Sequence, residues 1–353
     1  MNGEIYCKAP WTSVSCMPGG KFAPCCAWDG QYFNSIEEMI QEVGGQFLRN
    51  QIPKECTHPC PPNRVGWRDQ FKFFDTDYQQ HQINFLDFRN NNLCNLKCRS
   101  CSPNFSTSWA SEARENTINA FEPDTVRGLD LAHCKKVYFA GGEPLLNPQH
   151  YAVLQKLIDS NLDPVLMYST NLTVLQYKDQ HVQDLWKHFK EIWIHASIDA
   201  VGIHADTVRS GSNWASIEEN LSWLRTLPNV KIRIATVVSA INIWWLQELF
   251  DYFNWLDVDH FEPVIANSNS VLSISVIPEQ YRGPLIEMLE QSRFATCYNI
   301  KNAIELLHTR HDESQYWYKF LTQQLILDNY RNQHWFDHLP IKHNVYTKAL
   351  ING

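Results

Sequence analysis

The stretch NNNLCNLKCRSCSPN, residues 90–104, holds three of the eleven cysteines in a chain of 353 residues. Cys94, Cys98 and Cys101 form a C-x3-C-x2-C pattern that follows a strand-like run at residues 83–89. A structural zinc site normally closes with four ligands, and neither a fourth Cys nor a His follows within this loop. Three thiolates on a 4Fe-4S cluster leave one iron open to a small molecule. The spacing therefore favours an open cluster over a zinc site or a closed electron-transfer cluster.

Short β-branched or aromatic runs alternate with helical stretches from residue 81 onward, which predicts repeated βαβ units and a parallel sheet. Periodicity leaves open whether that sheet is doubly wound or curled into a partial barrel. Ligands gather at the carboxyl ends of the strands in both cases. The strand candidates are residues 83–89, 136–142, 164–171, 191–199, 231–239 and 259–266, and the helix candidates are residues 106–119, 149–161, 176–189, 216–227 and 243–256.

Small and polar residues follow three of these strands. The second ends in FAGGEPLLN, residues 139–147, in which two glycines let the backbone approach a ligand closely and Glu143 adds a carboxylate suited to an ammonium group. The third and fourth end in Ser169-Thr170-Asn171 and Ser197-Ile198-Asp199. Arg209 precedes a Gly/Ser-rich turn and is suited to a carboxylate, although a surface arginine at a helix start is the alternative.

The cysteine loop and the glycine-rich motif together resemble the radical S-adenosylmethionine (radical SAM) superfamily. The resemblance implies a partial (β/α)6 TIM-like barrel and a cluster on Cys94, Cys98 and Cys101, whose open iron is chelated by S-adenosylmethionine. Electron transfer from the cluster would cleave this cofactor to methionine and a 5′-deoxyadenosyl radical, which abstracts hydrogen from substrate. A reductant such as flavodoxin or ferredoxin is implied as a partner. The implied cofactor-binding residues are Gly141, Gly142, Glu143, Ser169, Asn171, Ser197, Asp199 and Arg209.

Six cysteines are crowded into residues 7–60. Their layout resembles the twitch and SPASM elements, which are auxiliary-cluster modules of radical SAM enzymes, although this module usually follows the barrel and more often closes with C-x2-C than with C-x3-C. Four thiolates would make a closed cluster, three would leave an iron for substrate, and a zinc knuckle is the remaining alternative. The expected ligands are Cys7, Cys25, Cys56 and Cys60, with Cys16 or Cys26 as alternates.

These patterns divide the chain into three parts: a Cys-rich auxiliary domain at residues 1–80, a barrel core at 81–275 and a helical C-terminal extension at 276–353. The formal net charge is −8 and basic blocks are absent, so a nucleic-acid partner is not expected. The sequence shows neither a secretory signal at its start nor an apolar run long enough to span a membrane, which predicts a cytoplasmic protein.

The substrate is the least constrained part of the hypothesis. The auxiliary module favours peptide or protein modification, while a sugar, a nucleotide or another small metabolite remains open. A non-catalytic iron-sulfur or zinc protein that transfers electrons or binds a partner is the alternative from another class. The residue for proton transfer is left unnamed. Polar candidates on or after the strands are Tyr168, His195, Asp199 and Glu262, and alternation along the fourth strand turns either His195, Ser197 and Asp199 or Ile194, Ala196 and Ile198 inwards.

Overall fold

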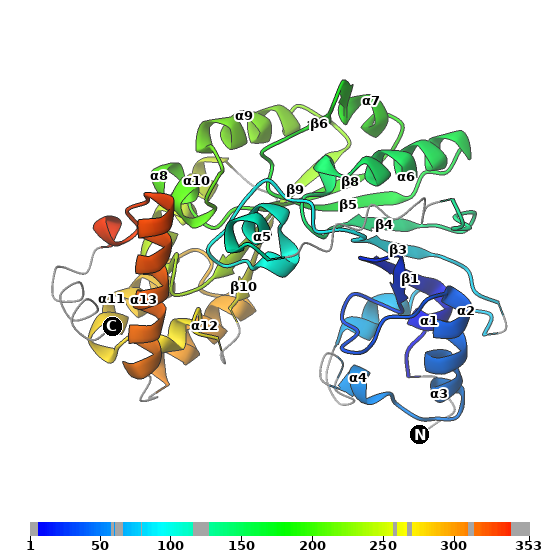
Figure 1. The fold of residues 1–353 in the computed structure, drawn as a ribbon, viewed down its shortest axis with the longest axis horizontal. Coiled ribbons are helices and arrows are strands. Elements are labelled where there is room, and N and C mark those ends of the chain that lie inside the picture. Colours follow the sequence, from blue (N-terminus) through cyan, green and yellow to red (C-terminus); the bar gives the residue numbers. More distant parts are fainter. Residues whose placement is uncertain are drawn as a thin grey trace.

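The computed structural model describes residues 6–57, 60, 66–78, 80–115, 127–256, 260–266, 270–309 and 314–339. Within these residues the central sheet has eight strands in the order β10-β9-β8-β5-β4-β3-β1-β2 (Figure 1). From β3 to β10, each strand is parallel to its neighbour. The bounds of these six strands are β3 Phe85–Phe88, β4 Lys136–Phe139, β5 Val165–Thr170, β8 Ile192–Ser197, β9 Val230–Val238 and β10 His260–Ile265.

The parallel strands confirm all six strand predictions, although residue 259 lies outside the described residues. The order from β3 to β10 follows the chain, with each new strand added on the same side of the sheet. A doubly wound sheet reverses its strand order at a switch point, and this sheet does not. Because the two edge strands, β10 and β2, are not paired with each other among the described residues, the sheet is an open, partial barrel. The predicted fold class is therefore confirmed.

Two further strands were missed by the sequence patterns. They are β1, Ser13–Met17, and β2, Lys21–Ala23. Strand β1 lies parallel to β3 and antiparallel to β2, so it extends the main sheet at its β3 edge. The expected boundary at residue 80 therefore falls between strands of one continuous sheet.

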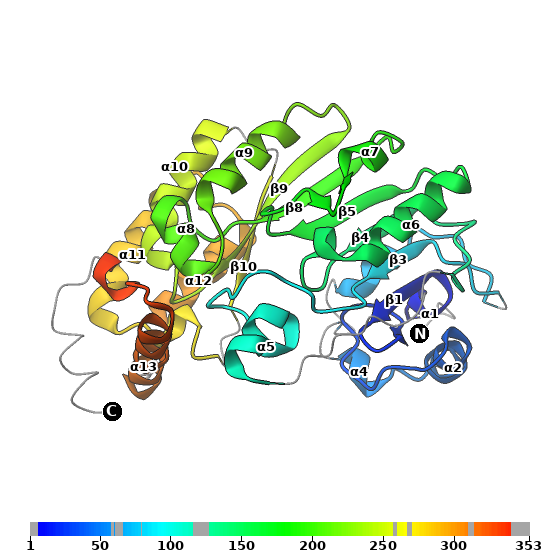
Figure 2. The ribbon, with the colours of Figure 1, turned by 45° about the horizontal axis from the view of Figure 1, so that its top comes forward.

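Helices cover one face of the sheet (Figure 2). Leu154, Trp186, Leu221 and Phe250 come from four different helices and share one core with buried sheet residues such as Ile194. Burial alternates along β5, β8 and β9, so one face of each strand is packed by helices while the other is only partly covered. The helices are α6 Pro148–Asp159, α7 Gln183–Trp186, α9 Trp214–Leu224 and α10 Leu246–Leu256.

One helix prediction is wrong. Residues 176–189 hold a small antiparallel pair, β6 Gln176–Tyr177 and β7 Gln180–His181, before the short α7. The turn between the two strands contains Lys178 with a positive φ of 52°, which breaks a helical path. The other four helix candidates are confirmed where they are described. The candidate at residues 106–119 corresponds to α5, Thr107–Ala113, and its residues 116–119 lie outside the described residues. Helix α8, Gly202–Val208, was not predicted.

The N-terminal region packs a helical layer beside β1. Trp11, Phe33, Met39, Val43 and Phe47 form its small core. Residues 36–48 are helical throughout, as α2, a π-helical stretch and α3 in direct succession. The helical elements are α1 Ala9–Thr12, α2 Ile36–Met39, the π-helical stretch Ile40–Gly44, α3 Gly45–Leu48 and α4 Lys54–Thr57.

Helices make up the C-terminal part, as predicted. They are α11 Glu279–Gln291, α12 Tyr298–His308 and α13 Ser314–Arg331. Figure 1 shows α13 on the far side of α5 from the N-terminal region. None of the helices in the described part of the chain is both long and apolar enough to cross a membrane.

Candidate functional site

The three cysteines of the C-x3-C-x2-C pattern lie on the loop between β3 and α5. The start of α5 holds the loop from one side, since Ser108 Oγ donates to Cys94 O at 2.8 Å and Trp109 Nε1 donates to Cys98 O at 3.0 Å. Two backbone bonds hold it from the other side, from Lys97 N to Ser210 O and from Arg99 N to Val208 O, both 2.8 Å. The ligand loop is therefore fixed between α5 and the end of α8.

Each of the first two thiols has a polar side chain next to it, one from the end of β5 and one from the end of α8. Asn171 Nδ2 lies 3.9 Å from Cys94 Sγ, and Arg209 Nη1 lies 3.8 Å from Cys98 Sγ. Burial raises the pKa of Cys94 to about 12 and that of Cys98 to about 11. Free thiols here are protonated at neutral pH, so loading a metal cluster must release protons.

The glycine pair after β4 packs directly on the cysteine loop. Gly141 has a φ of +108°, and a Cβ built on Gly142 would lie only 2.2 Å from Leu93 O. Glu143 N donates to the same Leu93 oxygen at 2.6 Å. These two positions therefore need glycine because the backbone of one loop touches the backbone of the other.

The Glu143 side chain is buried where the turn after β4 meets the end of β5. It is 1% exposed, and its carboxylate accepts hydrogen bonds from Leu145 N at 3.1 Å, Thr170 Oγ1 at 2.8 Å and Asn171 N at 2.7 Å. Burial raises its pKa to about 7. The carboxylate thus fixes Asn171, whose side-chain amide lies next to Cys94 Sγ.

Asp199 and Arg209 form an ion pair beside Cys98. Arg209 Nη2 lies 2.9 Å from Asp199 Oδ2, and Asp199 Oδ1 accepts a hydrogen bond from Val237 N at 2.8 Å. Asp199 is 2% exposed, and the Arg209 side chain is 13% exposed. Arg209 is thus a mostly buried residue and not a surface arginine, and its charge lies next to the Cys98 thiol.

The face of the sheet that the helices leave less covered carries polar and aromatic side chains on neighbouring strands. Tyr138 OH is 2.5 Å from Ser169 Oγ, and His195 Nδ1 is 3.7 Å from Glu262 Oε2. On β8, Ile194, Ala196 and Ile198 are buried in the helix-side core, so the set with His195 and Ser197 takes the other face. This is the polar-inward option of the two that alternation left open.

Tyr168 is on the opposite face from His195. It is fully buried under the helices, where its hydroxyl meets His150 Nε2 at 2.8 Å and accepts from Trp186 Nε1 at 2.9 Å. The suggestion that Tyr168 faces the inside of the barrel is therefore wrong. Its neighbours belong to the core, which explains why the strand needs an aromatic residue there.

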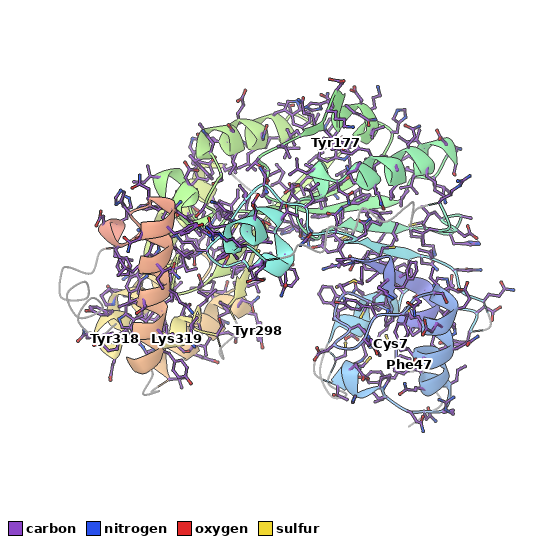
Figure 3. The ribbon with its side chains drawn as sticks, in the orientation of Figure 1. Cys7, Phe47, Tyr177, Tyr298, Tyr318 and Lys319 are labelled. Carbon is purple, nitrogen blue, oxygen red and sulfur yellow. The ribbon has the colours of Figure 1, made fainter. Side chains whose placement is uncertain are left out.

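Four of the six N-terminal cysteines line one pocket. They are Cys7, Cys25, Cys56 and Cys60, the four expected ligands, and Tyr6, Trp28, Phe47 and Arg68 complete much of the wall. Cys7 and Phe47 lie close together in the lower part of the N-terminal region (Figure 3). Burial raises the pKa of both Cys7 and Cys56 to about 12.

The two alternates lie elsewhere. Cys16 is fully buried in the sheet core. Cys26 lies against Asp87 of β3, and burial together with the Asp87 carboxylate raises the pKa of the Cys26 thiol. Cys25 and Cys26 are neighbours in the chain, but Cys25 lines the pocket and Cys26 contacts Asp87 instead.

Both cysteine sets have the donor chemistry of an iron-sulfur cluster. Among the described residues, no three His, Cys, Asp or Glu side chains converge on a position for one metal ion. A 4Fe-4S cluster makes no such demand, because each thiolate binds a different iron at a corner of the cube. The donors fit as well, since all seven are cysteines, the residue that holds such clusters.

Several residues of the site were not predicted. Thr170 and Leu93 join Glu143 to the cysteine loop, while Arg99 and Arg331 join that loop to α13. A charged residue between two ligand cysteines was the available signal for Arg99. The others depend on contacts between distant segments.

The family comparison agrees with this geometry. Residues 91–252 match the family model described as "Radical SAM superfamily". The matched segment runs from the cysteine loop to α10 and includes Glu143, Asn171, Asp199 and Arg209. Residues 91–252 are therefore similar to the radical SAM superfamily domain.

Individual proteins resemble the chain more weakly. An uncharacterized protein of Methanocaldococcus jannaschii is 28% identical over 173 residues, which are 46% of this chain and 55% of that protein. The chain thus matches about half the length of this relative. Among solved structures, anSMEcpe with bound AdoMet and Kp18Cys peptide has 14% identity and a TM-score of 0.41 over 58% of this chain and 59% of its own. Streptococcus suis SuiB bound to precursor peptide SuiA has 13% identity and a TM-score of 0.38 over 66% and 53%.

Proposed function

We propose that the protein is a radical SAM enzyme that binds a 4Fe-4S cluster through Cys94, Cys98 and Cys101 and cleaves S-adenosylmethionine there. One observation carries the proposal. Four consecutive strand ends converge on the loop with three cysteines: the loop itself follows β3, the glycine pair follows β4, Asn171 follows β5 and Asp199 follows β8. A site with three thiolates and further polar groups around them suits a cluster that shares one iron with a polar ligand.

The residues around the cluster would have separate tasks. A bound cluster would supply the electron that cleaves the sulfonium of S-adenosylmethionine to methionine and the 5′-deoxyadenosyl radical. Arg209 would place a positive charge beside Cys98 and the cofactor carboxylate, while Asp199 holds that guanidinium in place. Asn171 would contribute an amide to the cofactor, and Glu143 would keep it oriented through its backbone N–H. A flavodoxin or ferredoxin is the proposed reductant.

The glycine pair after β4 and two serines, Ser169 of β5 and Ser197 of β8, complete the proposed cofactor site. The backbone of Gly141 and Gly142 would border the cofactor's amino end. Ser197 ends β8 on the less covered face, and Ser169 lies on the same face of β5, where both would meet the ribose or the substrate. That face also carries the His195–Glu262 pair, so a substrate lying on it would meet polar as well as aromatic groups.

For the substrate, we propose a peptide or protein. The support is the N-terminal set of four cysteines, because auxiliary clusters accompany many radical SAM enzymes that act on large substrates. A sugar, nucleotide or other small metabolite is the alternative within the same chemistry. The alternative from another class is a non-catalytic iron-sulfur or zinc protein. Such a protein would bind no S-adenosylmethionine in calorimetry, and its function would not change with Glu143→Ala.

Iron content tests the second cluster. Anaerobic reconstitution is expected to give about eight irons per chain, four at each set of cysteines, against about four if the N-terminal site holds zinc. Cys25→Ala is expected to lower the count to about four, because Cys25 lines the pocket with Cys7, Cys56 and Cys60. The measurement is iron and zinc analysis by mass spectrometry on the purified, reconstituted protein.

Cys26→Ala is the matched control. It removes the neighbouring thiol, which lies against Asp87 and not in the pocket, so eight irons should remain. Equal iron in Cys25→Ala and wild type would contradict the proposed ligand set.

A further inference from the structure

We propose that the C-terminal helix α13 is a positioning element for the cysteine loop, acting through two buried arginines, Arg99 and Arg331. Helix α13, Ser314–Arg331, lies outside the segment that matches the radical SAM family. Its carboxyl end nevertheless contacts both segments that bring Cys98 and Arg209 together. This inference rests on the proposed function, since it concerns how the same cofactor site is held.

The cysteine loop and the Arg209 segment are joined backbone to backbone. Lys97 N donates to Ser210 O and Arg99 N donates to Val208 O, both at 2.8 Å. Cys98 lies between these two donors, and Arg209 lies between the two acceptors. The pairing therefore sets the 3.8 Å approach of Arg209 Nη1 to Cys98 Sγ. A shift of either segment would move the cationic group away from the thiol.

Arg99 connects this pair of segments to α13. Its side chain is completely buried. Nε donates to Thr207 O at 3.0 Å and Nη1 donates to Gln324 Oε1 at 3.1 Å. Nη2 pairs with Asp328 and donates to Gln333 Oε1 at 2.9 Å. A guanidinium with partners on α8, on α13 and just after α13 holds three segments at once.

Arg331, the last residue of α13, contacts the same cysteine loop at Lys97, on the other side of Cys98 from Arg99. Nη1 donates to Lys97 O at 2.8 Å and to Ser210 Oγ at 3.0 Å, so it contacts both segments of the backbone pair. Nε and Nη2 donate to Glu112 Oε1 of α5 at 2.8 and 2.6 Å. Its guanidinium also lies over the ring of Trp109, 4.9 Å from the centroid, and that indole donates to Cys98 O.

The contacts of Arg99 and Arg331 contribute to the position of the cysteine loop because both side chains are buried. An exposed arginine pair contributes little to structure, because water competes for its hydrogen bonds. Both of these guanidinium groups are almost fully buried, with side chains 0% and 3% exposed, so the loss of an acidic partner leaves a buried charge unpaired. The loop must then move to bring that charge to water, and Cys98 lies one residue from Arg99.

The test compares full-length, reconstituted protein with Asp328→Asn and Arg331→Lys variants. The asparagine keeps the size of Asp328 and removes the charge that faces Arg99, while the lysine keeps the charge of Arg331 and removes the forked contacts. We expect both to raise the Kd for S-adenosylmethionine about tenfold or more, by calorimetry. In the metal-free proteins, hydrogen exchange at the amides of Lys97 and Arg99 should also be about tenfold faster.

Asn329→Ala is the control, because Asn329 is exposed on the same helix next to Asp328. It should change neither quantity by more than about twofold. Faster exchange with an unchanged Kd in both variants would overturn the proposal, because α13 would then only stabilise the fold. Unchanged exchange would overturn it as well. If Asp328→Asn does not fold, Arg331→Lys alone decides. Wild-type protein that binds no S-adenosylmethionine would contradict the proposed function instead, and the exchange data would still show whether α13 holds the loop.

Discussion

Cys98→Ala protein is expected to form no 5′-deoxyadenosine from S-adenosylmethionine under reducing conditions. Cys98 is the middle ligand of the pattern and the thiol beside Arg209, at 3.8 Å from Nη1. Without it two thiolates remain on the loop, and a cluster with one open iron needs three. The measurement is 5′-deoxyadenosine by liquid chromatography and mass spectrometry after anaerobic reconstitution and reduction.

Cys297→Ala is the matched control for this variant. It also removes one thiol, but Cys297 precedes α12, far from the cysteine loop in the sequence, and the site does not use it. Its product yield should equal that of wild type. Cleavage retained by Cys98→Ala would refute the assignment of Cys98 as a ligand.

Gly142→Ala is expected to have the largest effect of any single methyl group added to this site. The new Cβ would be 2.2 Å from Leu93 O, a backbone atom of the cysteine loop that no side-chain rotation can move. One of the two loops must shift, so the free energy of unfolding should fall by about 3 kcal/mol or more, and cluster loading should fall with it. Denaturant unfolding and iron analysis measure the two effects.

Gly283→Ala provides the comparison. Gly283 lies inside α11, and a Cβ there meets nothing within 4 Å. Alanine favours a helix over glycine by up to about 1 kcal/mol, so this variant should be equal to wild type or more stable. Equal stability of Gly142→Ala and wild type would mean that the two loops do not touch as described.

Six parallel strands could be predicted because each has a run of β-branched or aromatic residues long enough to show in the sequence. Strands β1 and β2 could not, for two different reasons. β1, with the sequence SVSCM, has only one β-branched residue and no aromatic residue, and β2 is only three residues long. The helix predicted at residues 176–189 is wrong for a related reason. Two-residue strands leave no periodic signal, and the apolar residues of α7 suggested a longer helix.

The three-cysteine loop could be found from the sequence because its spacing is local. Cluster ligands on one loop must recur within a few residues, so Cys94, Cys98 and Cys101 stand out as candidates without a structure. Contacts between distant segments are not visible in this way. Arg99 and Asp328 are 229 positions apart, and the Glu143 carboxylate bonds to Thr170 and Asn171 from another strand. The sequence therefore indicated candidate residues but neither the residues that hold them nor the contacts between them.

The N-terminal cysteines stand between these cases. The resemblance to auxiliary-cluster modules favoured Cys7, Cys25, Cys56 and Cys60, and these four line one pocket. The burial of Cys16 in the sheet depends on β1, which the sequence did not reveal, so the alternates could not be separated beforehand. That the pocket holds a second cluster stays a prediction, for which iron content is the test.

The central claim is that the three-cysteine loop leaves one iron open for S-adenosylmethionine. Electron paramagnetic resonance of the reduced, reconstituted wild-type protein tests it most directly, with spectra recorded before and after S-adenosylmethionine is added. We expect the signal of one 4Fe-4S cluster to change its g-values on addition, because a cofactor that binds the open iron alters its ligand field. A spectrum that is the same with and without the cofactor would contradict the claim.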